Sequence, residues 1–431
     1  MRDTIHVGLL GLGVVGTAVA RTLADKAHTI ARRVGCPVRL RRVLVRHPDK
    51  PRPIAADLVT TNPGDVLEDE AVDIVVEVMG GEHPAYEYIL EAIRRGKHVV
   101  TANKEVMAKH GPEILARAAA QGVEVDFEAA VGGGIPVIGP FKIDLVANDI
   151  ASVTAIINGT TNYILTRMAR DHVDFDQALR EAQAQGYAEA DPRNDVEGLD
   201  AAYKLAILAS LAFRAQVDPR HVYTEGITRL SARDFRYARE LGYTIKLLAL
   251  ARSVDGAIEA RVHPALVPLQ HMLANVDDVY NAVVVDGDLV GRILFYGRGA
   301  GAGPTSSAVV ADIIDTATRI QLGHRGGPGL VFDGERRIRP MDEVETRYYL
   351  RLLAVDRPGV FAKITGVLGD HAISLASVIQ KEDVALPDGS VVAEIVLMTH
   401  RAQEVAVQEA VRRVAELPVV VEVGALIRVE G

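Results

Sequence analysis

The first third of the chain alternates short apolar runs with amphipathic helical patterns. Strands are predicted at Ile5–Leu10, Val38–Val45, Val72–Val78, His98–Thr101 and Val123–Phe127. Helices are predicted between them at Val14–Ala31, Pro84–Arg95 and Pro112–Gln121. Continuous apolar strands joined by helices are typical of a parallel sheet that is covered on both faces. We therefore expect an α/β fold with a doubly wound parallel sheet.

The order of elements changes at about residue 148. A strand at Ile150–Ile157 and a long helix at Val196–Arg214 precede three longer strands. These strands are predicted at Thr244–Arg252, Ile258–His263 and Val279–Tyr296, the last interrupted at Asp286-Gly287, and a helix follows at Thr305–Ile320. Helices and strands grouped in blocks indicate an α+β domain, which we expect to bind the substrate and to mediate oligomerisation.

The C-terminal part has its own pattern. His324–Met341 is rich in Gly, Arg and Pro and has no sustained period, which favours a linker. Strands are predicted beyond it at Arg347–Val355, Ile373–Gln380, Val391–Thr399 and Val419–Val429, with helices at Gly359–Gly369 and Ala402–Leu417. The resulting βαββαβ order is that of a ferredoxin-like domain.

Composition narrows the possible partners and compartments. The 431 residues include 48 Lys+Arg and 57 Asp+Glu, a net charge of −9, so no nucleic-acid partner is expected. No apolar run is long enough to predict a membrane span. Glycines interrupt the N-terminal apolar run Val7–Ala20, unlike a signal peptide. Cys36 is the only cysteine, which rules out disulfides within the chain and indicates a cytoplasmic protein.

A glycine motif, Gly11-x-Gly13-x-x-Gly16, follows the first predicted strand and opens the first predicted helix. In this setting the glycines allow a tight turn, close approach of a pyrophosphate and helix–strand packing, and the N–H groups at Val14 and Val15 face the phosphates. The motif therefore predicts a Rossmann-type dinucleotide site. A glycine-rich turn that binds nothing is the alternative.

The end of the second predicted strand bears on the choice of nucleotide. Arg46 stands where a 2′-phosphate would be held, which favours NADP. Asp49 nearby leaves NAD open, and a solvated strand end is the alternative interpretation of Arg46.

A carboxylate and a lysine share one face of the long central helix. Asp200 and Lys204 are four positions apart, and the face continues as Leu208 and Leu211. Partial burial lowers the pKa of a lysine toward the working pH, which suits a group that gives and takes a proton. An ion pair that only braces the helix is the alternative.

Six ordered motifs together resemble homoserine dehydrogenase. They are GLGVVG, TANK at Thr101–Lys104, EAAVGGGIP at Glu128–Pro136, NGTTNYIL at Asn158–Leu165, GYAEADPRNDVEGLDAAYK from Gly186 to Lys204, and YGRGAGAGPTSSAVVADI near Gly303. The resemblance spans about Ile5 to Ile320. The C-terminal segment, with Asp356-Arg357-Pro358-Gly359-Val360, looks like an ACT domain, an amino-acid-sensing module.

The resemblance implies a reaction and a division of the chain. The reaction is the reversible NAD(P)H-dependent reduction of L-aspartate 4-semialdehyde to L-homoserine, in threonine, methionine and isoleucine biosynthesis. The dinucleotide-binding domain would comprise residues 1–133, with 300–322 returning to it, and the substrate and oligomerisation domain residues 134–323. A linker over 324–346 and an ACT domain over 347–431 would follow.

Site residues carry over from the matching motifs. The resemblance implies Lys204 as the proton donor with Lys104 beside it, and Glu189, Asp200 and Asp195 around the substrate. Besides the glycine loop, Thr101, Lys104, Gly186 and Gly303 would contact the cofactor. A monovalent cation, usually sodium, would be held by main-chain oxygens at Glu128, Val131, Gly133 and Ile135.

The resemblance also implies regulation and assembly. Threonine is the expected inhibitor, acting through the ACT domain at the loop 356–361 and the strand 373–380, and a homodimer or homotetramer is expected. Another NADP-linked dehydrogenase of a small amino acid and a sensor without catalysis remain alternatives. Aspartate-semialdehyde dehydrogenase, in contrast, is excluded. That enzyme needs a cysteine nucleophile, and the only cysteine, Cys36, is expected far from the strand ends where ligands bind.

Overall fold

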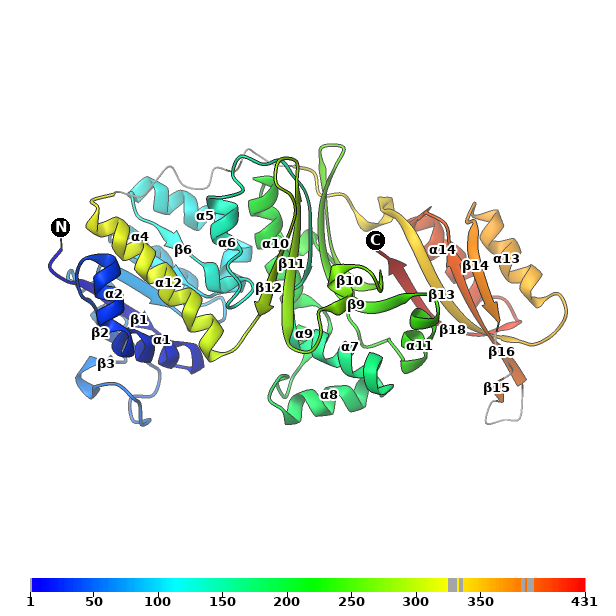
Figure 1. Ribbon diagram of the computed structural model, residues 1–431, viewed down its shortest axis with the longest axis horizontal. Helices are drawn as coiled ribbons and strands as arrows, with labels where there is room; N and C mark the ends of the chain where they lie inside the picture. The colour runs from blue at the N-terminus through cyan, green and yellow to red at the C-terminus, as the bar shows by residue number, and fades with distance from the viewer. Residues whose placement is uncertain (1, 325–331, 333–335, 381–383, 386–390, 431) are drawn as a thin grey trace. The chain divides into compact units, whose positions relative to one another are not determined.

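The computed structural model describes residues 2–324, 332, 336–380, 384–385 and 391–430. Two compact units emerge (Figure 1). The first contains Met1–Ile157, Tyr203–Val222 and Tyr280–Arg336, and the second contains Asn158–Ala202, Tyr223–Val279 and Arg337–Gly431. Each unit is described by itself below.

A parallel sheet dominates the first unit. Within the described residues it contains β1 (Ile5–Leu10), β2 (Val38–Leu44), β3 (Val59–Thr60), β4 (Ile74–Glu77), β5 (His98–Thr101) and β6 (Val125–Asp126). The strand order is β3-β2-β1-β4-β5-β6, and all neighbours are parallel. This order reverses between β1 and β4, which creates a crevice at the carboxyl ends of the strands, where dinucleotides bind in such folds. The doubly wound sheet is confirmed.

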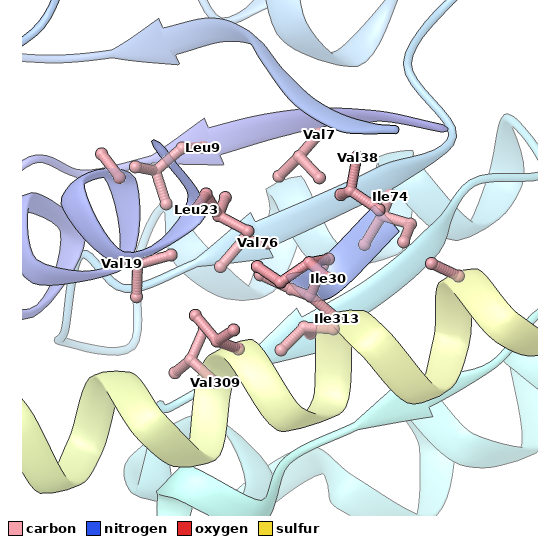
Figure 2. Packing of buried hydrophobic residues seen from close by; sticks show 14 of the residues in the cluster. Val7, Leu9, Val19, Leu23, Ile30, Val38, Ile74, Val76, Val309 and Ile313 are labelled. Atoms are coloured by element: carbon pink, nitrogen blue, oxygen red, sulfur yellow. The ribbon is translucent and has the colours of Figure 1, made fainter. Parts of the chain in front are cut away.

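Helices cover both faces of this sheet. One face carries α1 (Val14–Asp25), α2 (Ala27–Val34) and α12 (Ala302–Gln321), and the other carries α3 (Gly64–Leu67), α4 (Ala85–Arg94) and α5 (Lys104–Gln121). Figure 2 shows Val309 and Ile313 of α12 packed with Val7 and Val76 of the sheet. Helix α12 therefore completes the core of this sheet, although it lies much later in the chain than the other elements that form this core.

Three predicted helices have different bounds in the structure. The predicted helix Val14–Ala31 is two helices, interrupted at Lys26. The helix predicted to begin at Pro112 begins at Lys104, because the side chain of Asn103 caps it by accepting from the Val106 N–H. The long helix begins at Leu199, because Gly198 adopts a φ of +84° and separates it from the short helix α9 (Arg193–Val196).

The first unit also contains a small antiparallel sheet. It consists of β7 (Ile150–Ile156), β11 (Tyr280–Gly287) and β12 (Gly291–Arg298), in the order β12-β11-β7. The predicted interruption at Asp286-Gly287 is therefore the hairpin between β11 and β12. A short helix, α6 (Ile138–Lys142), precedes β7, and most of α10 (Leu199–Phe213) belongs to this unit.

A larger sheet forms the second unit. Its order is β9-β10-β18-β13-β16-β14, with bounds β9 (Tyr243–Val254), β10 (Ala257–Pro268), β13 (Glu345–Val355), β14 (Leu375–Gln380), β16 (Val391–Thr399) and β18 (Val420–Val429). Short strands β8 (Tyr223–Thr224), β15 (Val384–Ala385) and β17 (Ala402–Gln403) pair with β10, β16 and β13. The helices are α7 (Gly159–Asp171), α8 (Phe175–Ala184), α9 (Arg193–Val196), α11 (Ala232–Glu240), α13 (Val360–Asp370) and α14 (Glu404–Ala415).

The C-terminal segment has the predicted βαββαβ order, with α13 and α14 packed into one buried cluster on the sheet. It continues the sheet of the preceding segment, because β18 pairs in parallel with β10 through Ala265 and Arg428. Residues 325–331 and 333–335 of the predicted linker lie outside the described residues. The end of that linker is bound to β10, since Arg339 N–H donates to the carbonyl oxygen of Ile258.

Buried ion pairs tie this C-terminal segment to the rest of the second unit. Arg351 on β13 donates to Asp234 of α11 at 2.7 Å, and both side chains are almost fully buried. Arg261 of β10 likewise donates to Glu430 at 2.7 Å. Removing one partner of a buried pair leaves an uncompensated charge, at a cost of about 3–5 kcal/mol. The C-terminal segment is therefore an integral part of the second unit.

Candidate active site

The glycine loop between β1 and α1 has the geometry that its sequence predicts. Gly11 adopts a φ of +100°, which favours glycine. A Cβ on Gly16 would overlap the carbonyl oxygen of Gly11, so only glycine lets α1 approach the strand end this closely. A Cβ on Gly13 would meet nothing within 4 Å, so the loop is open on the side where a pyrophosphate would approach.

A cavity of about 490 Å³ adjoins this loop and is lined by Gly11, Gly13 and a group of basic side chains. The basic residues are Arg46, His47, Lys50 and Arg52. Neither Arg46 nor Lys50 forms an ion pair with a described residue. Arg52 instead donates to the carbonyl oxygens of Pro48 and Lys50 at 3.0 and 2.9 Å, which braces the loop.

Arg46 was predicted from the sequence, whereas Lys50 and Arg52 were not. The signal that could have found them is the density of basic residues directly after the second strand. Asp49, the residue that left NAD open, is exposed and is not among the residues that line this cavity.

The ends of β4 and β5 are joined by a buried network. Thr101 is fully buried, and its hydroxyl donates to Glu77 at 2.7 Å. Burial raises the pKa of Glu77, although the hydrogen bond from Thr101 opposes this shift. The Thr101 side chain is therefore engaged within this network. Lys104 begins α5 and is half-buried.

Two glycine-rich turns that lie far apart in the sequence pack against each other. A Cβ on Gly133 would overlap the carbonyl oxygen of Gly299, and the Gly134 N–H donates to the Arg298 carbonyl at 3.2 Å. The second turn leads into α12, whose second residue is Gly303. The structure thus brings together the predicted cation loop and the predicted cofactor-covering segment.

The carboxylate of Glu128 caps α6. It accepts hydrogen bonds from the N–H groups of Val137, Ile138 and Gly139 at 2.6, 2.8 and 2.7 Å. The main-chain oxygen of Glu128 accepts one hydrogen bond, from the Val131 N–H at 3.4 Å, and a carbonyl oxygen has a second lone pair for a cation. No cluster of three or more His, Cys, Asp or Glu side chains suited to a metal occurs among the described residues.

The predicted cation loop offers main-chain oxygens. In the part of the chain that the structure describes, the carbonyl oxygens of Val131, Gly133 and Ile135 accept no backbone hydrogen bond. Carbonyl oxygens of this kind are ligands for hard cations. The loop therefore fits the expected cation in its donor chemistry.

In the second unit, Asn158 holds the two predicted substrate acids together. Its amide donates to Asp195 at 2.7 Å and to Asp200 at 2.8 Å. Its side-chain oxygen accepts from the Thr161 N–H at 2.8 Å and thereby caps α7. Asp200 is only 2% exposed, so this amide supports a deeply buried carboxylate. Asn158 was not predicted, although an Asn before Gly-Thr-Thr is a typical helix cap.

The other predicted residues of this unit lie in the exposed turn after α8. Gly186 has a φ of +74°, which ends the helix. Glu189 is exposed, and its carbonyl oxygen accepts from Gln183 at 3.0 Å. Its carboxylate forms no ion pair with a described residue.

Lys204 lies on α10, within the first unit. Its Nζ donates to the carbonyl oxygen of Ile157 at 2.8 Å, directly after the end of β7. The neighbouring Leu205 and Leu208 are fully buried, which holds the helix and leaves the lysine half-buried. Lys204 and Asp200 thus bind consecutive residues of the chain, Ile157 and Asn158.

Comparisons with known proteins agree over the whole chain. Family models match as the NAD-binding domain of homoserine dehydrogenase over residues 11–128, as homoserine dehydrogenase over 136–314 and as an ACT domain over 348–419. The chain is 44% identical to homoserine dehydrogenase of Neisseria gonorrhoeae, over 99% of both proteins. The chain belongs to the homoserine dehydrogenase family. It is therefore an NAD(P)-dependent oxidoreductase that acts on a CH–OH group.

Solved structures of homoserine dehydrogenases give the same assignment. The enzyme from Thiobacillus denitrificans superposes with a TM-score of 0.92 at 48% identity, covering 99% of this chain and 98% of that one. A hyperthermophilic archaeal homoserine dehydrogenase in complex with NADPH superposes with a TM-score of 0.63 at 26% identity, covering 76% and 99%. The predicted family, enzyme class, Rossmann-type sheet and ACT domain are confirmed. None of the described helices is long and apolar enough to cross a membrane.

Two glycine variants separate nucleotide binding from folding. Gly13→Ala adds a methyl group that meets open space, so we expect unchanged stability but a dissociation constant for NADPH at least ~10-fold higher. Gly16→Ala overlaps the Gly11 carbonyl oxygen, so it should lose about 1–3 kcal/mol of unfolding free energy as well. Fluorescence titration and urea unfolding measure the two effects. Unchanged NADPH binding by Gly13→Ala would contradict the assignment.

Proposed function

We propose that the chain reduces L-aspartate 4-semialdehyde to L-homoserine, in the pathway to threonine, methionine and isoleucine, with Lys204 as the proton donor. Bound NADPH supplies the hydride. The observation that carries the proposal is the hydrogen bond from Lys204 Nζ to the Ile157 carbonyl oxygen at 2.8 Å. It fixes the direction of an ammonium group that can give a proton to a developing alkoxide.

Lys204 is proposed as the donor because the family resemblance gives it that role and its ammonium group is oriented by the Ile157 carbonyl oxygen. Lys104 is the first residue of α5, shortly after the end of β5. We assign Lys104 the role of a second polar group at the reacting oxygen and the cofactor.

The acids of the second unit are proposed to bind the substrate ammonium group. Asp200 and Asp195 each accept one bond from Asn158, and a carboxylate has further lone pairs for an ammonium ligand. Glu189, on the exposed turn beyond Gly186, supplies a third acid. Gly186 itself is proposed to meet the cofactor through its backbone.

NADP is the proposed nucleotide. Arg46 and Lys50 are cations that line the nucleotide cavity without an ion-pair partner among the described residues, which suits a 2′-phosphate. The archaeal homoserine dehydrogenase of this fold was solved with NADPH, which supports the same choice. Val14, Val15, Thr101 and Gly303 are proposed to contact this nucleotide.

A monovalent cation, sodium in the first instance, is proposed at the loop 128–135. Main-chain oxygens of Glu128, Val131, Gly133 and Ile135 would hold it. The close packing of this loop on Gly299 supports a structural role, in which the ion fixes two backbone turns.

Regulation and assembly complete the proposal. We propose inhibition by threonine through the ACT domain and a homodimer or homotetramer in the cytoplasm. Among the described strands β14 lies at the edge of its sheet, which supports the oligomer because edge strands readily pair with another chain. The domain bounds 1–133 with 300–322, 134–323 and 347–431 are proposed as well. The packing of α12 on the first sheet supports the returning segment.

Substitution of Lys204 tests the donor. Lys204→Ala and Lys204→Arg should both lower kcat by at least ~10²-fold, because arginine keeps the charge but does not release its proton at working pH. NADPH oxidation with L-aspartate 4-semialdehyde gives kcat, and NADPH binding should stay unchanged. Lys363→Ala, an exposed lysine on α13, is the control. A Lys204→Arg enzyme with nearly full kcat would show that the charge alone matters.

Substitution of the basic residues tests the nucleotide. Arg46→Ala combined with Lys50→Ala should raise KM for NADPH at least ~10-fold and leave KM for NADH within twofold, because only NADPH carries the 2′-phosphate. Arg32→Ala on α2, which does not line the cavity, is the matched control. Equal losses with both nucleotides would refute 2′-phosphate recognition.

A further inference from the structure

The second unit contains a cavity of about 490 Å³ apart from the proposed substrate residues. It lies between the ACT elements α14 and β18 on one side and the segment 223–230 on the other, and Glu197 also lines it. We call it the α14–β18 cavity. Its volume lies within the range of small-molecule sites.

Opposite charges line this cavity without neutralising each other. Glu197 and Arg229 are exposed, and neither forms an ion pair with a described residue. A third charged group, Arg428, is 1% exposed and is held by Glu225 at 2.6 Å. Glu404 also binds Arg428, at 2.8 Å to Nε, so this guanidinium is a fixed part of the wall.

The remaining walls are mixed. Val411 of α14 and Val423 and Leu426 of β18 provide partly buried apolar surface, and Thr228 provides a hydroxyl group. A cavity with one available carboxylate, one available guanidinium and short apolar walls matches a small ligand that carries both an ammonium and a carboxylate. A free α-amino acid has this chemistry.

One wall of the cavity is packed against the end of α9, which carries Asp195, one of the proposed substrate acids. A Cβ on Gly226 would overlap the carbonyl oxygen of Val196 and would lie 2.7 Å from the Cα of Glu197. The Ile227 N–H donates to the same Val196 oxygen at 2.9 Å. Val196 follows Asp195 in α9, so displacement of the segment 225–227 would be transmitted to Asp195.

We propose that the α14–β18 cavity is a binding site for a free α-amino acid, with Glu197 facing the ammonium and Arg229 the carboxylate. Occupancy acts on the substrate through the contact of Gly226 with Val196. This site is separate from the loop 356–361 and the strand 373–380, where an effector was expected from the sequence. Only its effect on substrate rests on the proposed function, since binding itself requires no turnover.

The test begins with binding to the full-length chain. Thermal-shift screening with each of the twenty L-amino acids, followed by titration calorimetry, should identify at least one ligand. Its dissociation constant should rise at least ~10-fold in Arg229→Gln and in Glu197→Gln, since each removes one charge-assisted contact. Arg239→Gln, an exposed arginine on α11 outside the cavity, should bind as the wild type does.

Three results would overturn the proposal: no amino acid binds, binding is unchanged in both cavity variants, or binding is lost in Asp356→Asn instead. A kinetic readout tests the coupling separately. The saturating ligand should raise KM for L-homoserine in the wild type but not in Arg229→Gln, whose KM without ligand stays within twofold of the wild type. If the amino acid binds but KM for L-homoserine does not change, the binding site is supported and the proposed coupling to Asp195 is refuted.

Discussion

The carboxylate of Asp200 is almost fully removed from water, and the amide of Asn158 supports it there. A buried charge is tolerated only when hydrogen bonds replace the lost water. Asn158 meets this need at 2.8 Å, binds Asp195 with the same amide and caps α7 with its oxygen. One side chain therefore fixes the start of α7, the short helix α9 and the first turn of α10. The proposed substrate acids depend on this arrangement.

The strands of the parallel sheet were predictable because burial on both faces requires a continuous run of apolar residues. The bounds of β1 and β5 match their apolar runs, and the glycine loop after β1 has the expected geometry. The bounds of the helices were less predictable, because one residue with a positive φ or one capping side chain can decide where a helix begins or ends. Gly198 separates α10 from the end of α9 within the segment predicted as one helix, and Asn103 starts α5 well before the proline that suggested its beginning.

Sequence motifs predicted which residues belong to the candidate site, but not how these residues are held in place. Their positions depend on tertiary contacts between distant segments, and no local sequence pattern encodes such contacts. The caps supplied by Glu128 and the packing of Gly133 on Gly299 join segments that lie far apart in sequence. The bonds from Asn158 to two acids on α9 and α10 are equally nonlocal. The sequence also predicted the ACT domain as a separate domain after a linker. In the structure, β18 of the ACT domain pairs with β10 of the preceding segment, so the two share one sheet.

The most direct test of this account is the KM for L-homoserine in Asn158→Ser. Serine can still cap α7 by accepting from the Thr161 N–H, but it has no amide to donate to Asp195 and Asp200. We expect a KM at least ~10-fold higher, consistent with the loss of a hydrogen bond to a buried carboxylate, and an unchanged dissociation constant for NADPH. A KM and kcat equal to those of the wild type would show that Asn158 does not hold the substrate acids in place.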